Sequence, residues 1–97
     1  MTAAIHEEII ILPAVQTIET IKGLHEEAKY GFNQTDFITI DASQVETIDT
    51  ASLQLLAILF QSAQQLAKTV VIQDPSPGFV EASQLSGLIG LFGITTE

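Results

Sequence analysis

Two aspartates and the hydroxyl residues beside them are the side chains best suited to chemistry. Asp41 ends an apolar segment, and Asp49 is followed directly by Thr50, Ala51 and Ser52. Two carboxylates could serve as a general acid and base, but the neighbouring sequence supplies no nucleophile–base pair, metal-ligand set or oxyanion-binding group. We therefore expect no enzymatic activity and no cofactor, and we expect Asp41 to bind amides of its own loop.

Thr50 occupies a position that suggests a more specific role. Asp49 is a favoured N-cap residue, and the long stretch without Gly or Pro after it predicts a helix that starts at Thr50. In the simplest interpretation, the Thr50 hydroxyl shares the capping of this helix with Asp49. Alternatively, a phosphate on Thr50 would lie at the positive end of the helix dipole, opposed by the Asp49 carboxylate. Phosphorylation would then change the surface charge more than the fold, which suits a signal that a partner reads.

The charge balance excludes several classes of function. The 97 residues include Lys22, Lys29 and Lys68 but no Arg, against twelve Asp and Glu, for a net charge of −9. Nucleic-acid binding needs clustered cations, and an anionic membrane surface would repel this chain. The lack of Cys excludes disulfides and thiolate metal sites, and His6 and His25 alone do not make a metal site. We expect instead a protein partner whose docking surface is basic.

Length and apolar content predict one domain over residues 1–97. With 46% hydrophobic residues, the chain can bury a single core. The segment Met1–Glu8 lacks the basic start and apolar region of a signal peptide. The longest apolar runs, Ile9–Leu12 and Leu55–Phe60, are too short to span a bilayer. We expect a cytoplasmic protein without direct membrane insertion.

Strands and helices are predicted to alternate along the chain. Short connections between them imply an α/β fold, with a small, mixed but mostly parallel sheet and helices packed on it. In the connection from Asp41 to Asp49, only Val45 and Ile48 are expected to point into the core. The predicted strands are 5–12, 37–41 and 69–73, the predicted helices are 14–29, 50–68 and 78–85, and a last helical turn over 88–94 is expected to cover the core.

The helix predicted from Thr50 to Lys68 is amphipathic, with one apolar residue on its polar side. On a helical wheel, Ile58 lies between Gln54 and Gln61, which should face water. Ile58 is either a single exposed apolar residue, which is common, or the anchor of a docking partner. The apolar arc is predicted to contain Leu53, Leu55, Leu56, Leu59, Phe60, Ala63, Leu66 and Ala67.

The sequence around Thr50 resembles the STAS domain family. The family pattern is a strand that ends in Asp, a loop with Val, and an Asp-Ser/Thr-Ser/Ala-Gly motif that opens a Leu-rich helix. Here these are Asp41, Val45 and Asp49–Ser52, and the likeness extends over about residues 37–92. The segments Val70–Ile72 and Leu85–Leu88 resemble the next strand and the closing Leu-x-Gly-Leu signature of the family.

The resemblance implies a function and a set of site residues. Anti-sigma-factor antagonists of this family bind a kinase/anti-sigma factor, which frees the sigma factor, and phosphorylation ends the binding. Thr50 would be the phosphoacceptor, the phosphosite loop would contain Asp49, Ala51 and Ser52, and Gln54, Ile58 and Gln61 would contact the partner.

The resemblance also implies two alternatives. In small STAS accessory subunits of lipid-trafficking ABC transporters, Thr is typical at the Thr50 position, and Thr50 would then be a contact residue for the transporter ATPase. A STAS module of a histidine-kinase or chemotaxis-type pathway is the other alternative. The chain departs from the family pattern at Ser52, which replaces a Gly and should stiffen the loop. In addition, only 5–12 is available where the family has two strands, so a reduced N-terminal hairpin is expected.

Overall fold

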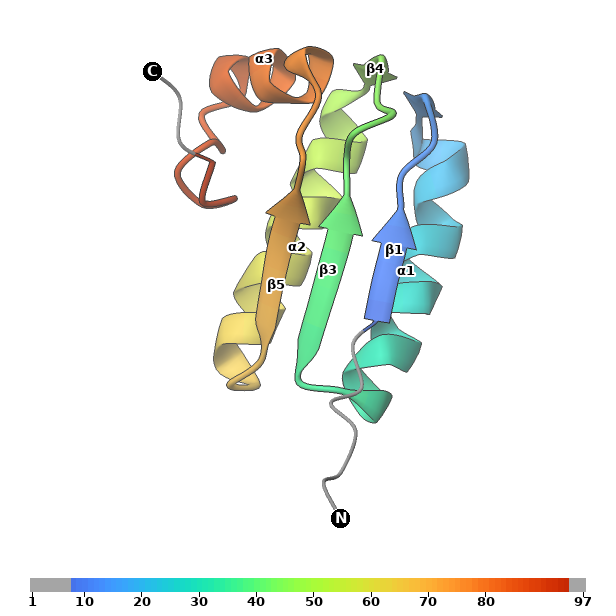
Figure 1. The fold of residues 1–97 in the computed structure, drawn as a ribbon, viewed down its shortest axis with the longest axis vertical. Helices are drawn as coiled ribbons and strands as arrows, with labels where there is room; N and C mark the ends of the chain where they lie inside the picture. Colours follow the sequence, from blue (N-terminus) through green and yellow to red (C-terminus); the bar gives the residue numbers. More distant parts are fainter. Residues whose placement is uncertain (1–7, 95–97) are drawn as a thin grey trace.

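A three-stranded sheet backed by two helices forms the body of the molecule (Figure 1). The computed structural model describes residues 8–94. Strand order in this sheet is β1-β3-β5, while β2 and β4 form a separate pair, and every strand pair in the described part is parallel. The elements are β1 (Glu8–Ile11), β2 (Val15–Gln16), α1 (Ile18–Gln34), β3 (Phe37–Asp41), β4 (Thr47–Ile48), α2 (Thr50–Gln65), β5 (Thr69–Gln73) and α3 (Pro77–Leu85).

Both long helices cover the same face of the sheet. Ile10, Ile40 and Ile72 are in register across the three strands, and Ile10 and Ile40 are buried under α1 and α2. Side chains alternate between the two faces of a strand, so Ile9 points the other way and is 53% exposed. Figure 1 shows α1 and α2 behind the strands, with α3 beyond the upper end of β5. The α/β fold expected from the sequence is confirmed, and the part of the first predicted strand before Glu8 lies outside the described residues.

The C-terminal stretch closes the core, as predicted. The amide of Phe92 donates to the Leu88 carbonyl at 3.0 Å, which forms one helical turn. The ring of Phe92 lies between Phe60 and Phe79, with centroid distances of 5.1 and 5.7 Å. Val45 is buried as expected, and Ile48 is partly buried.

The first helix begins and ends later than the sequence predicts. The Ala14 carbonyl accepts the amides of Glu46 and Thr47 at 2.8 and 3.0 Å, which draws the next two residues into β2. Thr17 becomes the N-cap, and its amide donates to Thr20 Oγ1 at 2.9 Å. The prediction of a helix from 14 to 29 ended by Gly31 and Asn33 is therefore wrong, because pairing with a distant strand prevails over local helical periodicity.

The second helix starts at Thr50 as predicted but stops at Gln65 rather than Lys68. Ala67 adopts a left-handed conformation with φ 57°, and the Lys68 amide donates back to the Ala63 carbonyl at 2.8 Å. These contacts form a helix-ending Schellman turn. Leu66 and Ala67 are consequently exposed, and their predicted place in the apolar arc is wrong.

The third helix is fixed tightly against the loop before β4. Ser76 is its N-cap, with its Oγ accepting the Phe79 amide at 3.1 Å and donating to the Val45 carbonyl. Pro77 follows at the first helical position, so the helix starts one residue before the predicted start at 78 and ends at Leu85 as predicted. A Cβ on Gly78 would lie 2.6 Å from the Glu46 carbonyl oxygen. The helix can therefore approach this loop only with Gly at that position.

Gly78→Ala should lower the free energy of unfolding by about 1 kcal/mol, because the clash with backbone outweighs the better helix propensity of Ala. Gly23→Ala is a matched control within α1, since nothing lies within 4 Å of a Cβ at Gly23. That substitution should stabilise the protein by about 0.5–1 kcal/mol. Urea denaturation of both variants measures the two changes. Equal effects would show that the close approach at Gly78 is unimportant.

Candidate functional site

The predicted site lies where both long helices begin. In Figure 1 the arrowheads of β1, β3 and β5 point toward the end of the molecule that holds the first turns of α1 and α2. Open α/β sheets generally place their binding sites outside the carboxyl ends of the strands. Asp41 closes β3 at this end, and Asp49 and Thr50 open α2 there.

Asp49 caps both helices with one carboxylate. Its Oδ1 accepts the Ser52 amide in α2 at 2.8 Å, and its Oδ2 accepts the Ile18 amide in α1 at 3.0 Å. The pKa of Asp49 is lowered from its ordinary value, chiefly because the side chain and the amide of Ser52 interact with the carboxylate, with help from the Ile18 amide. The carboxylate is thus directed toward the two helix starts.

Asp41 binds its own loop, as predicted. Its Oδ1 accepts the Ser43 amide at 2.9 Å. The Ser43 side chain and amide lower the pKa of Asp41 from its ordinary value. This carboxylate therefore has a structural partner within its own loop.

Thr50 presents an accessible hydroxyl at the first position of α2. Its side chain is exposed, and no hydrogen bond within the described part of the chain involves it. Ser52, in contrast, is fully buried, and its side chain faces the Asp49 carboxylate. Of the two hydroxyl residues in the motif, only Thr50 is open to another protein.

The predicted partner-binding residues share the outer face of α2 with Thr50. Gln54 and Gln61 are exposed, and Ile58 is 51% exposed between them. The structure thus confirms the predicted exposure of Ile58. Ala51 is exposed beside Thr50. The role of these side chains in binding stays a prediction.

Two apolar residues of this surface were missed from the sequence. Val15 is 55% exposed and Ile18 is 49% exposed, and the Ile18 amide is bonded to the residue before Thr50. The helix predicted over 14–29 includes both residues, whereas the structure places Val15 in β2 and Ile18 at the start of α1. The spacing of Thr17 and Thr20 was the available signal, because hydroxyls three residues apart at a helix start indicate an N-cap.

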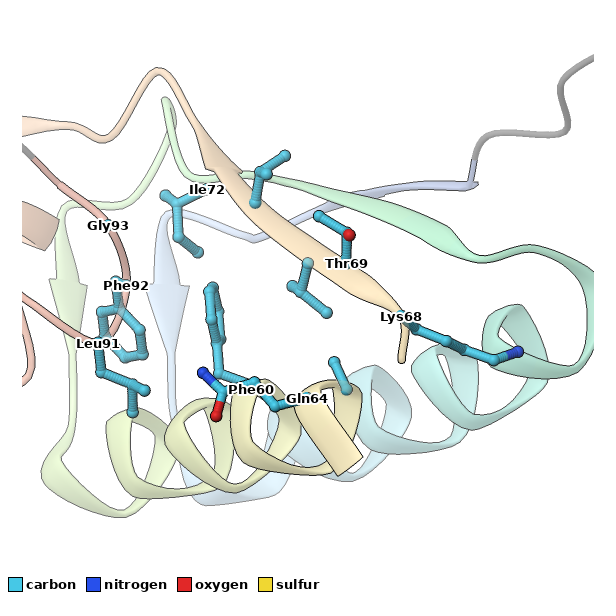
Figure 2. A pocket seen from close by; sticks show the side chains of 11 residues that line it. Phe60, Gln64, Lys68, Thr69, Ile72, Leu91, Phe92 and Gly93 are labelled. Atoms are coloured by element: carbon cyan, nitrogen blue, oxygen red, sulfur yellow. The ribbon is translucent and has the colours of Figure 1, made fainter. Parts of the chain in front are cut away.

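A separate cavity lies at the other end of α2. It has a volume of about 480 Å³ along the free edge of β5, under the C-terminal turn (Figure 2). Phe60, Ile72, Leu91 and Phe92 line it, whereas Lys68 points away from it and donates to the Phe32 and Thr35 carbonyls. Its described lining contains no carboxylate or imidazole. Because the α2 residues at its edge lie roughly 20 Å along the helix from Thr50, this cavity is separate from the predicted site.

The described residues were also compared with what a metal site or a membrane-spanning helix requires. Residues 8–94 contain no group of three or more His, Asp or Glu residues that could hold a metal ion. None of the helices in this range is long and apolar enough to cross a bilayer. His25 is exposed on α1, and His6 lies outside the described residues.

Comparison with known families decides the identity of the fold. The family model described as "Mlab, STAS domain" matches residues 6–93. The chain is a STAS domain protein. This confirms the resemblance inferred from the Asp49–Ser52 motif and extends it toward the N-terminus. No curated protein and no solved structure matches the chain. STAS domains are generally non-enzymatic regulatory modules that mediate protein–protein interactions.

Proposed function

We propose that this STAS domain protein is a non-enzymatic regulator of the anti-sigma-factor antagonist type. It binds a kinase/anti-sigma partner in the cytoplasm through the loop and helix that begin at Thr50. The observation that carries the proposal is the exposed Thr50 hydroxyl at the start of a firmly capped helix. Asp49 and the first turn of α2, where Ala51 is exposed and Ser52 is buried, form the segment offered to the kinase, and Gln54, Ile58 and Gln61 contact the partner.

Phosphorylation of Thr50 ends this interaction through a local effect. A phosphate adds about two negative charges at neutral pH, a small change for a chain that already carries −9. Ile18, whose amide is bonded to Asp49, is an exposed apolar residue at the start of α1, and Ile58 is exposed about two turns further along α2. A dianion at an apolar contact loses its hydration water on docking and gains no cation there in exchange. Phosphorylation therefore weakens docking even when the partner surface is basic elsewhere.

Kinases encoded near this gene should add one phosphate to the protein, and Thr50→Ala should remove that modification. The phosphorylated protein should bind its partner at least about tenfold more weakly, because the phosphate must be desolvated in the interface. Intact-protein mass spectrometry and calorimetric titration measure the two effects.

Thr47→Ala is the control, since Thr47 is also an exposed threonine of the same loop. Modification of the wild type at Thr47, or persistence of the phosphate in Thr50→Ala, would contradict the switch.

A second candidate is an accessory subunit clamped to an ABC transporter ATPase. Two observations favour it: the matched family model is described by the name Mlab, and Ser52 is packed with no exposed area where the family motif has Gly. Thr50 would then contact the ATPase without being modified. A stable complex that survives purification, is weakened by Thr50→Ala and carries no phosphate would support this candidate over the first.

A further inference from the structure

The unpaired lysines lie together with His25 on one side of α1. Lys22, His25 and Lys29 follow one another at spacings of three and four residues, which places them on one stripe of the helix. All three are exposed, and within residues 8–94 neither lysine forms an ion pair. The remaining lysine, Lys68, is already bonded to backbone carbonyls near the end of α1 and lies 3.6 Å from the Asp36 carboxylate.

A complementary apolar stripe follows α2. Ala51, Leu55 and Ile58 recur at the same three- and four-residue spacing, the polar Ser62 continues the row, and each is exposed or partly exposed. A hollow of about 240 Å³ lies where the two stripes come together, lined by Leu55 of α2 and by Lys22, His25 and Glu26 of α1. We call this hollow and the two stripes the α1–α2 groove.

The α1–α2 groove opens beside the proposed docking site. The Ile18 amide at the start of α1 is bonded to Asp49, so the upper end of the groove adjoins Thr50. From Ile18 to Lys29 the groove extends about 17 Å, the length of three helical turns. Leu55 is the apolar residue of the hollow. The α1 wall carries the exposed ammonium groups of Lys22, in the lining, and Lys29, about two turns further along, with the Glu26 carboxylate also in the lining.

We infer that the α1–α2 groove binds an amphipathic helix of the partner, with apolar side chains on Leu55 and Ile58 and acidic side chains beside Lys22 and Lys29. Charge complementarity selects this occupant, because the unpaired lysines of an otherwise acidic protein are concentrated on this wall. The inference rests on the proposed function in that the same partner docks at Thr50. It also refines the expectation of a wholly basic partner surface: along α1 the partner presents carboxylates. Grooves between helices commonly accept a helix by anchors three or four residues apart.

A matched pair of designed helical peptides tests the inference. Both peptides are about 18 residues long with the same leucine face, and one carries Glu and the other Lys along one flank. The Glu peptide should bind about tenfold more tightly at low salt and lose that advantage as salt rises. In NMR titrations of the labelled protein, the amide shifts should follow residues 18–29 and 51–62.

Charge variants distinguish an effect of the two groove lysines from an effect of the net charge of the protein. The double variant Lys22→Gln/Lys29→Gln should abolish the preference for the Glu peptide. The control Gln64→Glu/Gln84→Glu makes the same change in net charge at two exposed positions outside the groove and should keep the preference. Equal binding of the two peptides, no binding at about 1 mM, or concentration-dependent shifts of the groove without peptide would overturn the inference. The proposed function would survive any of these results if Thr50 phosphorylation still released the partner.

Discussion

Asp49→Ala is expected to lower the melting temperature by roughly 10 °C, because one substitution removes the caps of two helices. The wild-type carboxylate accepts the Ile18 amide of α1 and the Ser52 amide of α2. Without it, both amides lose their side-chain acceptor at the point where the helices meet. Asp41→Ala is the matched control, since that carboxylate accepts a single amide within its own loop. Thermal denaturation followed by circular dichroism should show a clearly smaller loss for Asp41→Ala.

The effect of Asp49→Ala should depend on pH in one direction. Hydrogen bonds lower the pKa of Asp49 in the folded protein below its ordinary value of 3.8. Stabilisation from a lowered pKa is fully present above the unfolded value and disappears as pH falls through the folded value. The difference in melting temperature between wild type and Asp49→Ala should therefore be constant above about pH 5 and shrink below pH 4. A difference that grows toward low pH would contradict the double-cap geometry.

Local sequence signals were sufficient to predict the bounds of those elements that depend on residues nearby in the sequence. The β-branched runs at Phe37–Asp41 and Thr69–Gln73 gave both strands at their observed bounds. Asp49 placed the start of α2, because an N-cap residue acts on amides two or three positions away.

The errors in the predicted fold arose where contacts between residues distant in the sequence determine the secondary structure. Val15 lies in a helical pattern, yet it pairs with Thr47 in a parallel strand. No local sequence pattern indicates pairing with a strand so far along the chain. Ala67 is a good helix former that the structure holds at positive φ, so α2 ends two residues before it.

The candidate site was predicted only in part, because some of its contacts also join residues that are distant in the sequence. The helical wheel correctly exposed Ile58, because the polar face of an amphipathic helix can be read from residue spacing alone. The second bond of Asp49, to Ile18, joins two helices and could not be read from either of them. Consequently the exposed apolar residues Val15 and Ile18 were not foreseen beside Thr50.

Ile58→Asp should weaken partner binding by about 30-fold or more while leaving the fold nearly unchanged. A half-exposed side chain loses little on substitution in the free protein, so the change in unfolding free energy should stay within about 0.5 kcal/mol. In the complex, the same position would bury a carboxylate against the apolar anchor site of the partner, and losses at such central residues commonly reach about 2 kcal/mol.

Leu66→Asp is the matched control, because it places the same charge on a residue of similar exposure, 55% against 51%, at the opposite end of α2. Calorimetric titration with the partner should separate the two variants, with Leu66→Asp binding like wild type. If both variants bind equally well, Ile58 is an ordinary exposed residue. If Ile58→Asp instead unfolds at a much lower temperature, its side chain contributes to the core. Only loss of binding at wild-type stability would identify the outer face of α2 as the docking surface, since neither net charge nor fold differs between the two variants.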